Sequence, residues 1–135
     1  MTSFTPGSEF VADTMALVLR IEKRRLGLRA KAAFDSAEAG TALIHLPGIV
    51  LAEILYLSEK KRIQTDLSSV SNYLGQFPGI REYPLNFAVA QAASQIQDIP
   101  ELHDRLIAGT ALLLQRELMS NDPAIQASKS VRTIW

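Results

Sequence analysis

The chain has no cysteine and only two histidines, His45 and His103. Without cysteine there is no disulfide, no thiolate zinc site and no cysteine nucleophile, so any metal ion must rest on oxygen or imidazole ligands. Because imidazoles are so few, oxygen ligands are favoured, and hard divalent cations such as magnesium or manganese suit them better than zinc does. We expect the two histidines to be an ordinary strand residue and an ordinary helix-start residue.

Two further features are missing: a long apolar run and a net charge. No stretch approaches the 18 uninterrupted apolar residues of a membrane span, and residues 1–7 lack the basic start and apolar core of a signal peptide. We therefore expect a cytoplasmic protein. The formal net charge of +0 argues against a chain that binds nucleic acid over its whole surface. At 135 residues, 47% of them hydrophobic, the chain fits a single domain, residues 1–135, with residues 1–8 as an N-terminal extension.

Short β-prone runs alternate with longer stretches of helical periodicity. This alternation predicts an α/β fold, with a central parallel sheet covered by helices on both faces. In such sheets the functional crevice lies outside the carboxyl ends of the strands. The expected strands cover residues 10–12, 41–46, 80–83, 118–121 and 131–135. The expected helices cover residues 15–25, 28–39, 49–60, 66–74, 86–97 and 103–117, and residues 122–123 are expected to form a turn.

Four acids stand out against this pattern. Asp13 and Asp122 follow expected strands, Asp104 begins an apolar helix, and Glu53 interrupts one of the most apolar helical stretches. Each has a structural explanation: a helix cap at Asp13, a turn at Asp122, a favourable helix dipole at Asp104, and an arginine or tyrosine partner for Glu53.

As a set the four acids predict a metal site. Carboxylates among apolar side chains are costly unless something compensates them, and a divalent cation does so. Three polar neighbours could hydrogen-bond the cluster or simply serve as cap and turn residues: Thr14, Ser120 and Asn121.

Basic residues gather in two places. One cluster comprises Lys23, Arg24, Arg25, Arg29 and Lys31, and the other comprises Lys60, Lys61 and Arg62. Both are explained by a solvated helix surface; the alternative is contact with a phosphate backbone beside an acidic site.

Four segments together resemble the PIN domain family, and most closely its VapC-type toxin ribonucleases. They are Val11-Ala12-Asp13-Thr14, Leu51-Ala52-Glu53-Ile54, residues 103–111 (HDRLIAGTA) and Met119-Ser120-Asn121-Asp122. The resemblance runs from about Phe10 to Trp135, and its third segment is the most specific. The chain departs from the family in its N-terminal extension and in Asn121, where many relatives carry a basic or other polar residue.

The resemblance implies a three-layer α/β/α sandwich and a Mg²⁺- or Mn²⁺-dependent endoribonuclease, the toxin of a toxin–antitoxin pair. The family's acidic site maps onto Asp13, Glu53, Asp104 and Asp122, with Asp13 and Asp104 as the most direct metal ligands. The implied partners are an RNA substrate, a cognate antitoxin and a second copy of the chain.

Two other functions compete with this one. A non-catalytic PIN-like module would act through protein or RNA contacts alone. A phosphotransfer domain would need a lysine near the relevant strand ends, and none fills that role. Leu26 and Leu28 could hold the tail of an antitoxin, although core packing is the simpler expectation.

Overall fold

A computed structural model describes residues 4–135; residues 1–3 of the expected N-terminal extension lie outside it. The described part holds five strands and seven helices, which alternate along the chain. The strands are β1 (Ser8–Ala12), β2 (Ala42–Pro47), β3 (Ile80–Tyr83), β4 (Glu117–Met119) and β5 (Thr133–Ile134). The helices are α1 (Thr14–Ile21), α2 (Leu28–Glu38), α3 (Gly48–Glu59), α4 (Leu67–Gln76), α5 (Phe87–Ser94), α6 (Leu102–Leu114) and α7 (Pro123–Gln126).

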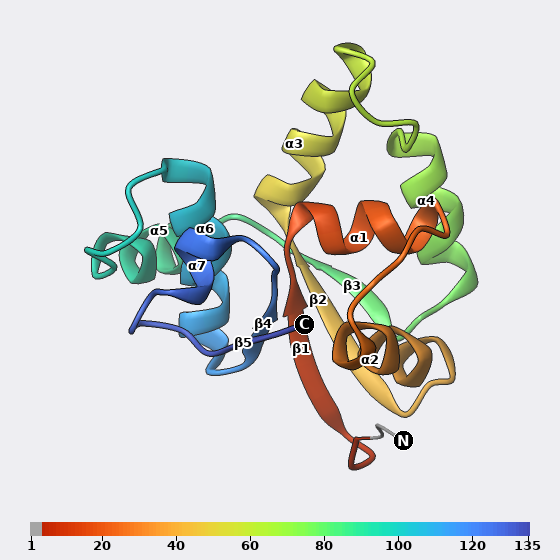
Figure 1. The fold of residues 1–135 in the computed structure, drawn as a ribbon, viewed down its shortest axis with the longest axis horizontal. Helices are drawn as coiled ribbons and strands as arrows, with labels where there is room; N and C mark the ends of the chain where they lie inside the picture. Colours follow the sequence, from red (N-terminus) through yellow and green to blue (C-terminus); the bar gives the residue numbers. More distant parts are fainter. Residues whose placement is uncertain (1–3) are drawn as a thin grey trace.

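All five strands are parallel, in the order β3-β2-β1-β4-β5. Figure 1 shows α1, α2 and α4 on one side of the sheet and α5 and α6 on the other. The predicted α/β/α sandwich with a parallel sheet is therefore confirmed. The chain winds outward from β1 to β3, then crosses over through α5 and α6 and resumes on the other side of β1 with β4. The order reverses between β1 and β4, and this switch point is where parallel sheets place their sites.

The central strand β1 is fixed in place by its burial in the hydrophobic core. Phe10, Val11 and Ala12 of β1 are all buried, because both faces of the strand are covered by helices. On α2, three buried alanines flank Phe34, and these small side chains let the helix approach the sheet closely. The largest fully buried side chains include Leu17, Phe34, Ile44, Leu46, Ile54, Ile107 and Leu118.

Several observed elements differ from the expected ones in their bounds, and three of the differences are informative. Helix α1 ends at Ile21 rather than near residue 25, and Lys23 then turns the chain with a positive φ of 57°. Helix α6 ends at Leu114, where Gln115 adopts φ 54°, and this earlier end frees Glu117 to begin β4. The expected turn at residues 122–123 was wrong: Pro123 instead occupies the first position of α7, where its fixed φ favours a helix.

The helices were expected not to include a membrane span, and their length and polarity bear on this expectation. Within residues 4–135, none of the helices has the length and apolar character that crossing a membrane requires.

Candidate functional site

The residues that directly follow β1 and β4, the two strands at the switch point, lie next to each other. Ala12 of β1 pairs with Met119 of β4, and the Asp13 N–H extends this ladder by donating to the Met119 carbonyl at 3.1 Å. Asp13 and Ser120 therefore leave the carboxyl edge of the sheet side by side. This edge carries a cavity of about 270 Å³.

Asp13 caps α1 and also faces this cavity. Its Oδ1 accepts the Ala16 N–H at 2.8 Å, and only 6% of the residue is exposed. Burial raises the pKa of Asp13 to about 6, against the hydrogen bonds from Ser120 and Ala16 that lower it. The negative charges of Asp122 and Glu53 raise this pKa further. The helix cap predicted for Asp13 is confirmed, and because the same residue also lines the cavity, the cap does not rule out the functional interpretation.

The segment after β4 supplies the second wall. Asp122 accepts the Ala124 N–H at 2.8 Å and so caps α7, while its own N–H donates to the Ser120 Oγ at 3.1 Å. Ser120 is fully buried and supports both Asp13 and Asp122 from beneath, whereas Asn121 lines the cavity itself. The polar neighbours predicted from the sequence thus lie in or directly behind the cavity.

Glu53 reaches the cavity from α3, and side chains of two other helices contact it. The Thr14 hydroxyl, at the start of α1, donates to Oε1 of Glu53. The Nδ1 atom of His103, in the first turn of α6, lies 3.3 Å from Oε2. The structural explanation considered for Glu53, an arginine or tyrosine partner, was therefore wrong. His103 is a site neighbour that sequence reasoning set aside; its position directly before Asp104 was the available signal.

Asp104 comes from the same first turn of α6. The helix is capped not by Asp104 but by Glu101, whose carboxylate accepts the N–H groups of His103 and Asp104. Asp104 is thereby free to face the cavity. Partial burial raises the pKa of Asp104 to about 6, and the charges of Asp122, Glu101, Glu53 and Asp13 add to this rise.

Four carboxylates make the cavity acidic. Among the ion pairs of residues 4–135, none joins an arginine or lysine to any of its four carboxylates, and His103 is their only partner. The lining is Asp13, Thr14, Met15, Glu53, Leu57, Asp104, Ile107, Asn121, Asp122, Pro123 and Ile125. Four oxygen-donating side chains, with the pKa of Asp13 and Asp104 raised, suit a hard divalent cation.

The cavity suits a cation in its donor atoms and its negative charge, but its side chains do not form a complete set of direct ligands. In the part of the chain that the structure describes, no three acidic or histidine side chains are arranged so that they could hold a metal ion directly. Mg²⁺ typically keeps several waters and binds proteins through one or two carboxylates. A cation held by two of these carboxylates and by waters is compatible with the arrangement.

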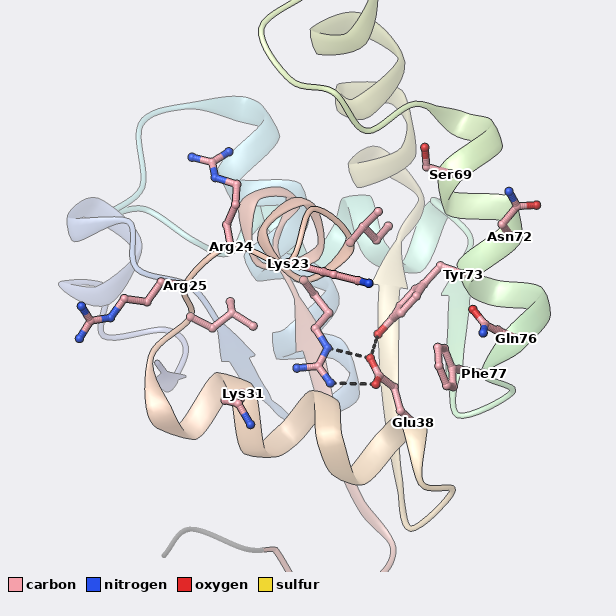
Figure 2. Close-up of a pocket in the computed structure, with 13 residues that line it drawn as sticks. Lys23, Arg24, Arg25, Lys31, Glu38, Ser69, Asn72, Tyr73, Gln76 and Phe77 are labelled. Carbon is pink, nitrogen blue, oxygen red and sulfur yellow. Dashed lines mark hydrogen bonds and ion pairs between the residues drawn. The ribbon is translucent and has the colours of Figure 1, made fainter.

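Four residues of the first basic cluster line a different cavity from the acidic one. Lys23, Arg24, Arg25 and Lys31 border a separate groove of about 900 Å³ between α1, α2 and α4, and the two cavities share no lining residue. Arg20 and Tyr73 both hydrogen-bond to Glu38, and all three residues line this groove. Figure 2 shows Tyr73 directed toward Glu38. Arg20 Nε lies 2.8 Å from Glu38 Oε2, so the acid in the groove is neutralised. We call this feature the basic groove.

Fold and site together define a class of protein: a doubly wound parallel α/β/α domain with a carboxylate-lined cavity at its topological switch point. The family model for the PIN domain matches residues 10–129 of this chain. The chain belongs to the PIN domain family.

Several solved structures share the fold over nearly the whole chain. A chain of VapBC2 from Rickettsia felis, solved with a promoter DNA fragment, is 18% identical, with a TM-score of 0.71 over 94% of this chain and 98% of its own. DNA-bound VapBC from Salmonella typhimurium gives 17% identity and a TM-score of 0.69 over 94% and 97%. A toxin–antitoxin complex from Klebsiella pneumoniae gives 17% identity and a TM-score of 0.61 over 93% and 95%. No curated protein sequence matches the chain.

Proposed function

We propose that these 135 residues form one nuclease domain, a Mg²⁺- or Mn²⁺-dependent endoribonuclease that acts as the toxin of a toxin–antitoxin pair. The observation that carries the proposal is the convergence of four carboxylates, from four separate elements, on one cavity, with no lysine or arginine of residues 4–135 paired to them. Family membership and the likeness to VapBC chains support it.

The side chains have distinct tasks in this proposal. Asp13 and Asp104 are the carboxylates with raised pKa, so they gain most from a cation, and we assign them as its direct ligands. Glu53 and Asp122 would complete the shell through metal-bound waters or with a second ion; Glu53 is tied to Thr14, and Asp122 to the start of α7. A bound Mg²⁺ or Mn²⁺ would polarise the scissile phosphate and lower the pKa of an attacking water.

The neighbours keep this set in place. Ser120 holds Asp13 and Asp122 relative to each other, because it donates to the first and accepts from the second. Ile107 and Ile125 line the cavity with apolar surface, which limits the water around the carboxylates and strengthens their pull on a cation.

The test is a divalent-ion titration of RNA cleavage by the purified protein. We expect cleavage that needs Mg²⁺ or Mn²⁺, stops with EDTA, and falls at least 100-fold in Asp104→Asn. The matched control is Glu59→Gln, which removes one negative charge from an exposed position of α3, outside the cavity. Equal cleavage by Asp104→Asn and wild type would refute the assignment of the site.

The alternative is a PIN-like binding module without catalysis. Calorimetry distinguishes the two, since the nuclease must bind a divalent ion in the acidic cavity. A chain that binds no such ion and cuts no RNA belongs to the second class.

The basic groove has the chemistry of a partner site. Ile21, Leu26 and Phe77 contribute apolar surface, while the four basic side chains stand along its border. Figure 2 shows Lys23 reaching toward Tyr73, and Arg24 and Arg25 projecting from the loop between α1 and α2. With Glu38 already engaged by Arg20, an acidic segment with apolar anchors complements this border. We assign that segment to the antitoxin.

A co-purification experiment tests this assignment. The probe is the product of any small gene for a DNA-binding protein directly upstream, co-expressed with tagged wild type and with Lys23→Glu/Arg25→Glu. The double variant should lose the partner, whereas Lys60→Glu/Lys61→Glu, the same charge change at the end of α3, should retain it. Retention by both pairs would refute the groove as the docking site. The homodimer implied by the family resemblance is tested separately, by light scattering of the purified chain.

A further inference from the structure

Glu53 differs from the other acids in how it is held. Asp13 and Asp122 each accept N–H groups at the start of a helix, so the backbone orients their carboxylates. Glu53 lies in the interior of α3, where every backbone N–H is used by the helix itself, and its longer side chain has more rotamers to lose. Only side chains from other elements can orient it.

Two side chains are in position to do so, one at each oxygen. The Thr14 hydroxyl donates to Oε1, and the His103 Nδ1 lies 3.3 Å from Oε2. A single contact leaves a carboxylate free to rotate about its last bond, whereas contacts at both oxygens define its plane. Each oxygen keeps a further lone pair for a cation or a metal-bound water.

We infer that His103 is a positioning residue, which donates its Nδ1–H to Glu53 and orients this carboxylate toward the cation of the acidic cavity. The inference rests on the proposed function, because it concerns the same site. Through His103 and Asp104, the first turn of α6 then sets the position of two of the four carboxylates.

If His103 only stabilised the fold, replacing it would change thermal stability rather than cation affinity. Half of the His103 side chain is exposed, and contacts between such partly exposed groups add little to stability. Removing the His103 side chain should therefore weaken cation binding and leave thermal stability unchanged. Removing a partner that orients a metal-ligating side chain typically weakens metal binding 10- to 100-fold.

The experiment compares three substitutions by calorimetric titration with MnCl₂. Asparagine carries its N–H₂ on the same atom that bears Nδ1 in histidine, whereas glutamine places it where Nε2 lies. We expect about tenfold weaker Mn²⁺ binding in His103→Ala and His103→Gln, recovery in His103→Asn, and an unchanged Tm without cation in all three.

The possible failures can be told apart. Wild-type affinity in His103→Ala, or recovery by glutamine as full as by asparagine, overturns the positioning role and leaves the cation site standing. Absence of Mn²⁺ binding by the wild type overturns the cation site itself, and the role of His103 with it.

Discussion

The raised pKa of Asp13 makes the acidic cavity a source of instability while no cation is bound. Its pKa moves from an ordinary 3.8 to about 6, chiefly because the side chain is buried. One pKa unit corresponds to about 1.4 kcal/mol, so ionised Asp13 costs the cation-free protein about 3 kcal/mol. We predict that Asp13→Asn, which cannot ionise, is more stable than wild type at pH 8 without divalent ions.

The pH dependence follows from the direction of the shift. Because the folded-state pKa lies above the unfolded one, folding favours the protonated form; this contribution is complete below about pH 4 and is lost as the pH rises through about 6. Roughly half of the 3 kcal/mol falls between pH 5 and pH 8. The carboxyls with lowered pKa, Glu38 among them, stay ionised throughout that range, since their stabilisation is lost only at lower pH.

Thermal unfolding in EDTA between pH 5 and pH 8 measures the effect. At roughly 4 °C per kcal/mol for a domain of this size, the Asp13 contribution alone should lower the wild-type Tm by about 6 °C across this range, and Asp104, whose pKa is also raised to about 6, adds to this fall. The Asp13→Asn curve should keep only the slope that comes from Asp104, whose pKa is also raised to about 6, and should lie several degrees higher at pH 8, because Asn keeps the oxygen that accepts the Ala16 N–H. A wild-type Tm independent of pH, or an Asp13→Asn protein less stable at pH 8, would refute the reasoning.

Three further predictions concern the cation, the α5–α6 contact and the basic groove. MnCl₂ at 100 times its dissociation constant should stabilise the wild type by about 2.7 kcal/mol in thermal unfolding, and EDTA should reverse the gain. Gly109→Ala should lose about 1–3 kcal/mol in urea unfolding, because the new Cβ would lie 2.9 Å from Ala93, whereas Gly75→Ala meets nothing within 4 Å and should lose nothing. Tyr73→Phe should cost about 1 kcal/mol, measured the same way, by removing the hydroxyl bond to Glu38.

The sequence predicted the elements well and their ends poorly, for a physical reason. Helical periodicity located α1 and α6, but a helix stops where the backbone turns, and no pattern marked Lys23 or Gln115 as residues with positive φ. Pro123 was ambiguous in the same way, since proline suits both a turn and the first residue of a helix. Such local choices are decided by packing against the rest of the chain.

For the first basic cluster, the sequence predicted the charge but not the part of the fold that the cluster faces. Its residues are consecutive or nearly so in the sequence, which indicated a charged surface but not what the surface faces. The path of the loop after Ile21 decides that question, and it carries Lys23 toward α4, a helix more than forty residues later, and not toward the acidic cavity. The alternative left open for this cluster, a phosphate contact beside the acidic site, has no support from the cavity that Lys23, Arg24, Arg25 and Lys31 line.

The acids that follow strands could be predicted to share one edge of the sheet, because the edge at which parallel strands end depends only on their direction. Asp13 and Asp122 each follow a strand, so an all-parallel sheet sends both to one edge whatever the strand order. Their adjacency needs more: β4 must lie next to β1, which depends on the crossover through α5 and α6. That crossover also carries His103 and Asp104 to the same edge. The connection that reverses the strand order is therefore the one that completes the cavity, and Gly109, which lets α5 and α6 pack closely, supports the site from a distance.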